Sequence, residues 1–153
     1  MQSLLPIAAR AGDLLKTRNE TIAIAESSAG GLISAALLAV PGASAYFLGG
    51  GVVYTAESRL ALLQMPREEI IRSSEQSALN LARAVRKQLG ATWALGETGA
   101  AGPTGPSGRL FLAVTGPFEI SLHEETGVED RVENMRRFAK SALNLLVDVL
   151  ERP

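Results

Sequence analysis

The chain has 153 residues, a length that suits one domain with a sizeable core. Hydrophobic residues make up 46% of it and charged residues 20%, which predicts a globular protein and excludes a disordered one. The net charge is only −1, with acids and bases spread along the chain. Because binding to a phosphate backbone needs a basic face, this balance argues against nucleic acid as the main partner.

The scarcity of cysteine and histidine limits the kinds of site that the chain can build. It has no cysteine and one histidine, His123, which excludes disulfides, thiolate metal sites and multi-histidine metal sites, so we expect no metal. Residues 1–11 lack the pattern of a signal peptide, and the longest apolar stretch, residues 32–40, is far shorter than the ~20 residues of a membrane span. We therefore expect a cytoplasmic protein with no membrane partner.

Helix and strand patterns alternate along the first half of the chain. Apolar residues on one stripe predict an N-terminal helix, and a β-rich run at residues 21–25 predicts a buried strand. A Pro-Gly pair ends the following helix, and three consecutive glycines in the next strand indicate a bulge or a close backbone approach. The elements expected after the first strand are a helix at 30–40, a strand at 46–54 and a short helix at 57–64.

The second half of the chain predicts two more helices and three more strands. The expected elements are an amphipathic helix at 75–89, a buried strand at 92–95, a Gly/Pro loop at 99–108, strands at 110–114 and 118–122, and a last helix at 129–150. The last two strands flank a Thr-Gly-Pro turn, which predicts a hairpin and therefore one antiparallel strand. The alternation predicts an α/β fold, a three-layer α/β/α sandwich with a mixed five-stranded sheet, as a single domain over residues 1–153.

The most informative segment is the turn after the first strand, residues 25–31 (AESSAGG). Ser27 lies there at a helix N-terminus, where unpaired N–H groups and the positive end of the helix dipole converge. Such a serine can cap the helix, bind an anion or act as a nucleophile. For a nucleophile, the N–H groups of residues 28–31 are the expected oxyanion hole. The local pattern leaves the three roles open.

Four motifs in order resemble the signatures of the CinA C-terminal family. Residues 25–31 resemble its AES-C/S-T-GG motif, and residues 41–44 with 49–54 resemble its PGSS and GGVVxYS segments. Residues 98–105 (TGAAGPTG) resemble its TGIAGPTGG loop, and residues 129–131 are similar to the Gly-Asp-Arg start of its final helix. Because the resemblance covers nearly the whole chain, the chain is identified as a member of this family.

The resemblance implies a nicotinamide-nucleotide amidase, which hydrolyses nicotinamide mononucleotide to nicotinic acid mononucleotide and ammonia without a cofactor. It implies Ser27 as the nucleophile and Tyr54 as an active-site tyrosine. The implied substrate-binding positions are Gly30, Gly31, Thr98, Gly99, Gly102, Thr104, Gly105 and Arg131. The implied partner is a small nucleotide, to whose phosphate Arg131 offers a bidentate fork.

One departure from the family concerns the base that a serine hydroxyl needs. The family's lysine, five residues after the tyrosine, is Arg59 here, and a guanidinium stays charged where a lysine can release its proton. Arg59 is then either a solvated charge or a pocket residue that acts electrostatically while water or Glu57 handles the proton. Further departures are Ala56 in place of asparagine, Ser28-Ala29 in place of Cys-Thr, and Pro106 in the glycine loop.

These observations support two hypotheses of different class. In the first, the chain is an amidase-like hydrolase with Ser27, Tyr54 and Arg59 as catalytic residues. In the second, it is a catalytically degenerate paralogue that acts as a nucleotide-binding or protein-interaction module, which the exchange of lysine for Arg59 favours. Glu26 is expected to support the structure and His123 to lie on an exposed edge strand. The apolar composition leaves room for a homo-oligomer.

Overall fold

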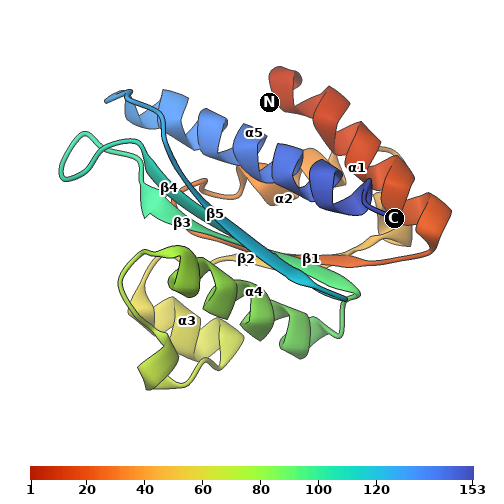
Figure 1. Ribbon diagram of the computed structural model, residues 1–153, viewed down its shortest axis with the longest axis horizontal. Helices are drawn as coiled ribbons and strands as arrows, with labels where there is room; N and C mark the ends of the chain where they lie inside the picture. The colour runs from red at the N-terminus through yellow and green to blue at the C-terminus, as the bar shows by residue number, and fades with distance from the viewer.

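The computed structural model describes residues 1–153 and shows one five-stranded sheet with helices on both faces (Figure 1). The strands are β1 (Ile22–Glu26), β2 (Phe47–Val52), β3 (Trp93–Ala100), β4 (Arg109–Thr115) and β5 (Glu119–Glu125). The helices are α1 (Leu5–Arg18), α2 (Leu32–Leu38), α3 (Ala56–Leu63), α4 (Glu75–Leu89) and α5 (Arg131–Leu150), with short 3-10 helices η1 (Gln2–Leu4), η2 (Ala43–Ala45) and η3 (Arg67–Glu69). No helix combines the length and the apolar character that a membrane span requires.

The strands lie in the order β2-β1-β3-β4-β5. β1 pairs in parallel with both β2 and β3, whereas β4 pairs antiparallel with both β3 and β5. The α/β class and the mixed five-stranded sheet are confirmed. The sequence predicts antiparallel pairing from the hairpin alone, and the structure adds a second antiparallel pairing because the Gly/Pro loop also turns β4 back along β3.

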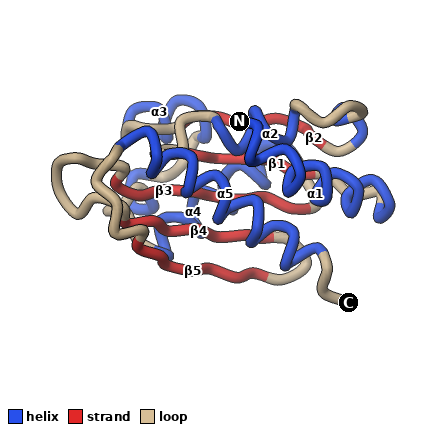
Figure 2. Tube along the Cα trace, turned by 90° about the horizontal axis from the view of Figure 1, so that it is seen from above, coloured by secondary structure: helices blue, strands red, loops and turns tan.

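The helices cover the two faces of the sheet unequally. α1, α2 and α5 lie on one face, and α3 and α4 lie on the other (Figures 1 and 2). Alternate residues of β1 point to opposite faces of the sheet. Ile22 and Ile24 belong to the larger hydrophobic core on one face, and Ala23 and Ala25 belong to the smaller core on the other. A strand buried on both faces reads as a continuous apolar run, which is why β1 was recognisable in the sequence.

The glycines of β2 permit a close approach to β1. The pairing register with β1 shifts at Leu48, so the irregularity in this strand lies just before the glycines, which themselves pair regularly with residues 23–25. The structure therefore bears out the close backbone approach expected at the glycines and places the bulge one residue earlier. A Cβ on Gly50 would lie 2.8 Å from Ser34 Oγ and 2.9 Å from the Ile24 carbonyl oxygen, so a larger residue there would push β1 and α2 away.

Two element boundaries near the functional edge differ from the expected ones. α2 begins at Leu32 instead of residue 30, because Gly30 and Gly31 have φ values of +68° and +98°, outside the helical range. β3 continues to Ala100 instead of ending at residue 95, because its polar residues are buried and its backbone keeps pairing with β4 as far as Arg109. The segment that starts at residue 99 is therefore first strand and then loop.

Candidate active site

The residues singled out in the sequence leave the sheet at one edge, where the carboxyl ends of the three parallel strands meet. Ser27 directly follows β1, Tyr54 lies two residues after β2, and Thr98 lies near the end of β3. Arg131 is the first residue of α5. In α/β folds, the crevice outside the carboxyl ends of the strands is where ligands bind.

The side chain of Glu26 closes the N-terminus of α2. Its carboxylate accepts hydrogen bonds from the N–H groups of Gly31 (2.9 Å), Ile33 (3.1 Å) and Ser34 (2.8 Å), and from the Ser34 hydroxyl (2.7 Å). The side chain is fully buried, and its charge faces the positive end of the helix dipole. Because Gly31 at the N-cap position has no side chain to accept these bonds, Glu26 takes over the cap, which confirms its expected structural role.

A second buried carboxylate, Glu97 of β3, lies against the same turn. It is 0% exposed and accepts hydrogen bonds from the Ser28 hydroxyl (3.0 Å to each oxygen) and from the Ala29 N–H (2.6 Å). Burial raises the pKa of Glu97 to about 7; the Glu26 carboxylate pushes it in the same direction, whereas the donors of Ala29, Ser28 and Ser27 hold it down. Sequence reasoning missed this residue, although a glutamate inside an otherwise small and apolar run was a visible signal.

The expected oxyanion hole of residues 28–31 is largely taken up by internal acceptors. The Ala29 N–H donates to Glu97, the Gly30 N–H to the Ser27 carbonyl (3.1 Å), and the Gly31 N–H to Glu26. The expectation is therefore wrong for three of these four groups. The physical reason is that a helix N-terminus buried at a sheet edge must pair its N–H groups, and here two glutamates from the strands reach it.

The two serines of the turn have different surroundings. Each residue is 6% exposed. The Ser28 hydroxyl donates to Glu97, whereas the Ser27 hydroxyl makes no hydrogen bond within the chain. The only buried side-chain oxygen without a partner is Ser107 Oγ, so the Ser27 hydroxyl keeps contact with solvent. The structure thus pairs one of the two hydroxyls with a proton acceptor.

Arg59 is a buried residue of this edge and not a solvated charge. Its side chain reaches from α3 to the end of β2, where Nε donates to the Val53 carbonyl oxygen at 3.0 Å, and the residue is only 8% exposed. Burial lowers the pKa of Arg59, and the attraction of Glu97 works in the opposite direction. The terminal guanidinium nitrogens have no internal partner and are not sealed from solvent, so they are available to an anionic group.

Arg131 links Tyr54 to the glycine loop. One terminal nitrogen donates to the Gly102 carbonyl oxygen at 2.5 Å and the other to the Tyr54 hydroxyl at 3.3 Å. Tyr54 is 59% exposed, so its ring stands at the rim of this edge. Three segments that are far apart in the sequence thus meet through one guanidinium.

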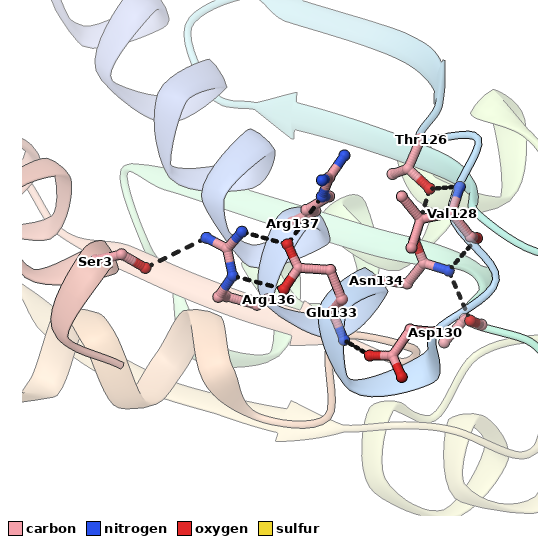
Figure 3. Close-up of polar contacts among 9 residues, drawn as sticks. Ser3, Thr126, Val128, Asp130, Glu133, Asn134, Arg136 and Arg137 are labelled. Carbon is pink, nitrogen blue, oxygen red and sulfur yellow. Dashed lines mark hydrogen bonds and ion pairs between the residues drawn. The ribbon is translucent and has the colours of Figure 1, made fainter.

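The start of α5 is held in place by its own polar network (Figure 3). The Asp130 carboxylate accepts from the Glu133 N–H at 2.8 Å and caps the helix. The Asn134 amide donates to the carbonyl oxygens of Ala101 and Val128, both at 2.8 Å, and its oxygen accepts from the Thr126 hydroxyl at 2.6 Å. This network fastens the first turn of α5, and with it Arg131, to the glycine loop.

Some of the predicted binding residues face elsewhere. Thr98 points to the α4 side of the sheet, where its hydroxyl lies 2.8 Å from the Ser73 hydroxyl. A hollow of about 420 Å³ on that side is lined by Arg72, Ser73, Gly99, Ala100, Pro106, Arg109 and Phe111, and contains neither Ser27 nor Tyr54. Thr104 and Gly105 are exposed at the tip of the loop, and no atom lies within 4 Å of a Cβ added to Gly105.

The predicted glycines next to the serines have packing partners. A Cβ on Gly30 would come within 2.6 Å of the Met135 side chain, and one on Gly31 within 3.4 Å of Val52. Gly99 sits against Ser28 Oγ, 3.2 Å from where its Cβ would be. These glycines therefore let neighbouring elements approach the turn, and Gly99 brings the loop segment next to Ser28.

His123 lies away from this edge. It is exposed on the outer strand β5 and stacks on Phe111, with ring centroids 4.9 Å apart, which confirms its expected place on an edge strand. No three or more acidic or histidine side chains gather closely enough to hold a metal ion.

Comparison with known proteins places the chain in a family. The family model of the CinA C-terminal domain matches residues 5–150. A CinA-like protein of Chloroherpeton thalassium is 35% identical over 95% of this chain and 38% of its own length, and one of Acidobacterium capsulatum is 39% identical over 86% and 34%. The chain thus spans less than two fifths of the length of these relatives.

Solved structures agree with this match. The competence/damage inducible protein CihA of Agrobacterium tumefaciens is 30% identical, with a TM-score of 0.87 over 97% of this chain and 96% of that one. The competence damage-inducible protein A of Klebsiella pneumoniae MGH 78578, at 24% identity and a TM-score of 0.90 over 96% of both chains, shares the fold. By its sequence motifs, its matched residues and its fold, the chain belongs to the CinA C-terminal domain family.

Proposed function

We propose that the chain, acting as one domain over residues 1–153, is a nicotinamide-nucleotide amidase-like hydrolase. The reaction adds water to the carboxamide of nicotinamide mononucleotide and yields nicotinic acid mononucleotide and ammonia. The nucleophile is a serine hydroxyl of the turn after β1, a role that the resemblance gives to Ser27. The observation that carries the proposal is the convergence of this turn, Arg59 and the Tyr54–Arg131–Gly102 contact at one edge of the sheet.

The two arginines suit two parts of such a substrate. Arg131 is exposed at the rim, where its fork matches a phosphate group, and Tyr54 beside it offers an aromatic face. Arg59 lies deeper and keeps its charge, so it stabilises negative charge near the serines and does not accept a proton at neutral pH. In this proposal, the phosphate lies at the rim and the carboxamide lies inward.

A second candidate function is a nucleotide-binding module without amidase activity. The specific observation that favours it is the pairing of the turn's N–H groups with Glu26 and Glu97, because an oxyanion then lacks most of the donors expected for it. In that case, the rim with Arg131 and Tyr54 would keep a ligand site while the chemistry is lost.

The experiment that tests the proposal measures ammonia release from nicotinamide mononucleotide by the purified protein. The matched control is the double variant Ser27→Ala/Ser28→Ala, which removes both hydroxyls of the turn. Activity in the wild type that disappears in the control supports the amidase. A thermal shift with the nucleotide, but no ammonia from the wild type, supports the binding module instead.

We predict that Arg131→Ala weakens nucleotide binding, because it removes the guanidinium offered to the phosphate. A charged hydrogen bond contributes roughly 1.5–3 kcal/mol, so KM is expected to rise about 10- to 100-fold with a smaller change in kcat. The matched control is Lys140→Ala, an exposed cation on the same helix. Equal KM values for Arg131→Ala and the control would remove Arg131 from the binding site.

A further inference from the structure

We infer that the outer edge of β2 is the docking surface for a second copy of this chain. Two copies related by a two-fold axis pair their β2 strands antiparallel and join their five-stranded sheets into one continuous sheet. The inference concerns assembly and does not depend on the proposed hydrolysis, so the failure of one leaves the other standing.

The two edges of the sheet differ in charge. β2 and β5 are the outermost strands (Figure 2), so each has backbone N–H and C=O groups with no partner strand on its outer side. β5 carries the exposed acids Glu119, Glu124 and Glu125, and such charges keep an edge from pairing with another chain. β2 has the sequence FLGGGV, with neither a charged residue nor a proline. The edge of β2 therefore lacks the charges that protect β5.

The surface around β2 is uncharged and apolar. Residues 27–56 contain no charged residue, although charged residues make up 20% of the chain. Val52 is 48% exposed and Leu48 is 45% exposed, and α2 next to them exposes Leu38. On the other face of β2, a hollow of about 370 Å³ is lined by the glycines of the strand and by side chains of α3 and α4 that are mostly apolar, among them the exposed Leu62. Exposed apolar surface beside an open sheet edge is typical of a protein interface.

The backbone of β2 is suited to pairing with a copy of itself. The Val53 N–H donates to the Glu26 carbonyl oxygen at 2.8 Å, so residue 53, and by alternation Gly51, turns its backbone groups toward β1. Gly50 and Val52 therefore present their backbone groups to the outer edge. In antiparallel pairing centred on Gly51, Gly50 of each copy lies opposite Val52 of the other, and each of these pairs exchanges both of its backbone hydrogen bonds.

The side chains suit the same register. Because Gly50 has no side chain, the Val52 side chain of the opposite copy has room beside it. The bulge at Leu48 lies outside the paired stretch. No residue of this stretch is charged, so two identical surfaces meet without like-charge repulsion. A neutral edge whose bonding residues match each other about one axis favours a second copy over an unrelated strand. The acidic β5 edges then lie at the two ends of the joined sheet, so the assembly closes as a dimer.

The first test measures the mass of the protein in solution by light scattering over a concentration series. We expect a dimer for the wild type. Val52→Lys brings a lysine of each copy close to the axis, where like charges oppose association, so the dissociation constant of the dimer should rise by at least about 100-fold. Val132→Lys makes the same exchange at a valine of α5 that is 74% exposed, and this matched control should remain a dimer. Unfolding temperatures show whether both variants are folded.

The second test identifies the surface and the register. The chain has no cysteine, so a disulfide in the variant Gly51→Cys forms only between two copies. The Cα atoms of an antiparallel pair without hydrogen bonds lie about 4.5 Å apart, which a disulfide can span. A Cβ on Gly51 would meet its nearest neighbour at 3.5 Å, an ordinary contact, so the variant should fold. We expect oxidation to give a covalent dimer of Gly51→Cys under conditions in which the control Val132→Cys remains largely uncross-linked.

Every outcome of these tests decides the inference. It is overturned by a wild type that is monomeric at every concentration, by a dimer that folded Val52→Lys leaves intact, or by a dimer that Gly51→Cys does not cross-link. A mass that keeps growing with concentration points to open-ended pairing of β2 with β5 and also overturns it. A wild-type dimer that Val52→Lys separates and Gly51→Cys cross-links supports it, whether or not the protein releases ammonia from nicotinamide mononucleotide.

Discussion

At the scale of single residues, buried charges set the chemistry of the functional edge. Glu26 and Glu97 reach the same turn from neighbouring strands, and Arg59 faces Glu97 from α3. Burying a charge is unfavourable unless hydrogen bonds or an opposite charge compensate it. Glu26 has four donors at one helix end, whereas Glu97 is left with a raised pKa. Although both carboxylates lie against the same turn, Glu26 caps α2, whereas Glu97 is the one whose pKa is raised.

The raised pKa of Glu97 predicts a pH dependence of stability. The folded protein binds this proton below about pH 7, whereas a glutamate of the unfolded chain, with its ordinary pKa of 4.5, binds it only below that pH. Between these values the folded state holds more protons, so the free energy of unfolding falls as the pH rises from 4.5 to 7. Glu119 and Glu133, whose pKa values hydrogen bonds from Arg83 and Arg136 lower to about 2, act below this window.

Urea unfolding at pH 5 and pH 8 checks this prediction. The wild type is expected to lose stability on the order of a few kcal/mol between these values, relative to Glu97→Gln, which has no proton to release. Parallel curves for the two proteins would show that Glu97 ionises in the folded state as readily as in the unfolded one.

Loss of the cation at position 59 is predicted to shift the titration of Glu97. Arg59→Met removes a positive charge that is attracted to the Glu97 carboxylate, so the midpoint of the pH-dependent loss of stability, measured relative to Glu97→Gln, should move upward. Arg59→Lys keeps a cation and serves as the matched control, with a midpoint near that of the wild type. An unmoved midpoint in Arg59→Met would show that the two groups are not coupled.

At the scale of elements, the short helix α2 depends on a carboxylate from the preceding strand. α2 has seven residues and begins after two glycines in left-handed conformations, so it has no side-chain cap of its own. Isolated helices of this length do not form in water, because nucleation is unfavourable. Its N-terminal N–H groups are paired by Glu26 instead. The end of β1 and the start of α2 are thereby a single hydrogen-bonded unit.

Glu26→Ala is predicted to destabilise the protein strongly. It leaves the N–H groups of the buried Ile33 and the half-buried Gly31 and Ser34 without their acceptor, and a buried donor left unpaired costs about 1–3 kcal/mol. We expect a loss of about 2 kcal/mol or more in the free energy of unfolding. Glu57→Ala, which removes an exposed first-turn acid of α3, is the control and should change it by less than about 1 kcal/mol. Similar losses in both variants would contradict the capping role.

At the scale of the whole molecule, helices pack on both faces of the sheet, and the closest contact with α4 is at a glycine of the sheet. α4 lies directly against β3 at Gly96, where a Cβ would overlap the Ala78 carbonyl. On the other face, α1, α2 and α5 bury the larger core (Figure 1). The packing of α4 against Gly96 therefore sets how close β3 lies to α4. It thereby also helps to position Glu97, the next residue of the strand.

Gly96→Ala is predicted to separate these layers. The added methyl group has no free space, and overpacking a core costs about 1–3 kcal/mol or more. Gly51→Ala is a suitable control, since its Cβ would meet its nearest neighbour at 3.5 Å and its φ is not positive. Thermal unfolding should show a lower melting temperature for Gly96→Ala than for the control. Equal temperatures would mean that α4 can shift without loss.

The sequence by itself determined the order of the elements and the family. The amphipathic pattern of α4 predicted its observed bounds, residues 75–89, because side chains one turn apart share a face. The apolar run of β1 and the glycines of β2 could also be interpreted from the sequence. The first reflects burial of the strand on both faces, and the second reflects a close approach of two backbones. The motifs at residues 25–31 and 98–105 predicted which segments would meet at the sheet edge.

Only the tertiary structure decided what lies inside that edge. Glu97 is 69 residues from Ser28 in the chain, and their hydrogen bond depends on the parallel pairing of β1 with β3. Likewise, two of the N–H groups expected to be free in the turn donate to glutamates of neighbouring strands and a third donates to a carbonyl of the turn itself, and Arg59 is buried. Local patterns report what a backbone segment needs, whereas the pKa and the partners of a side chain depend on which distant groups the sheet brings within 3 Å.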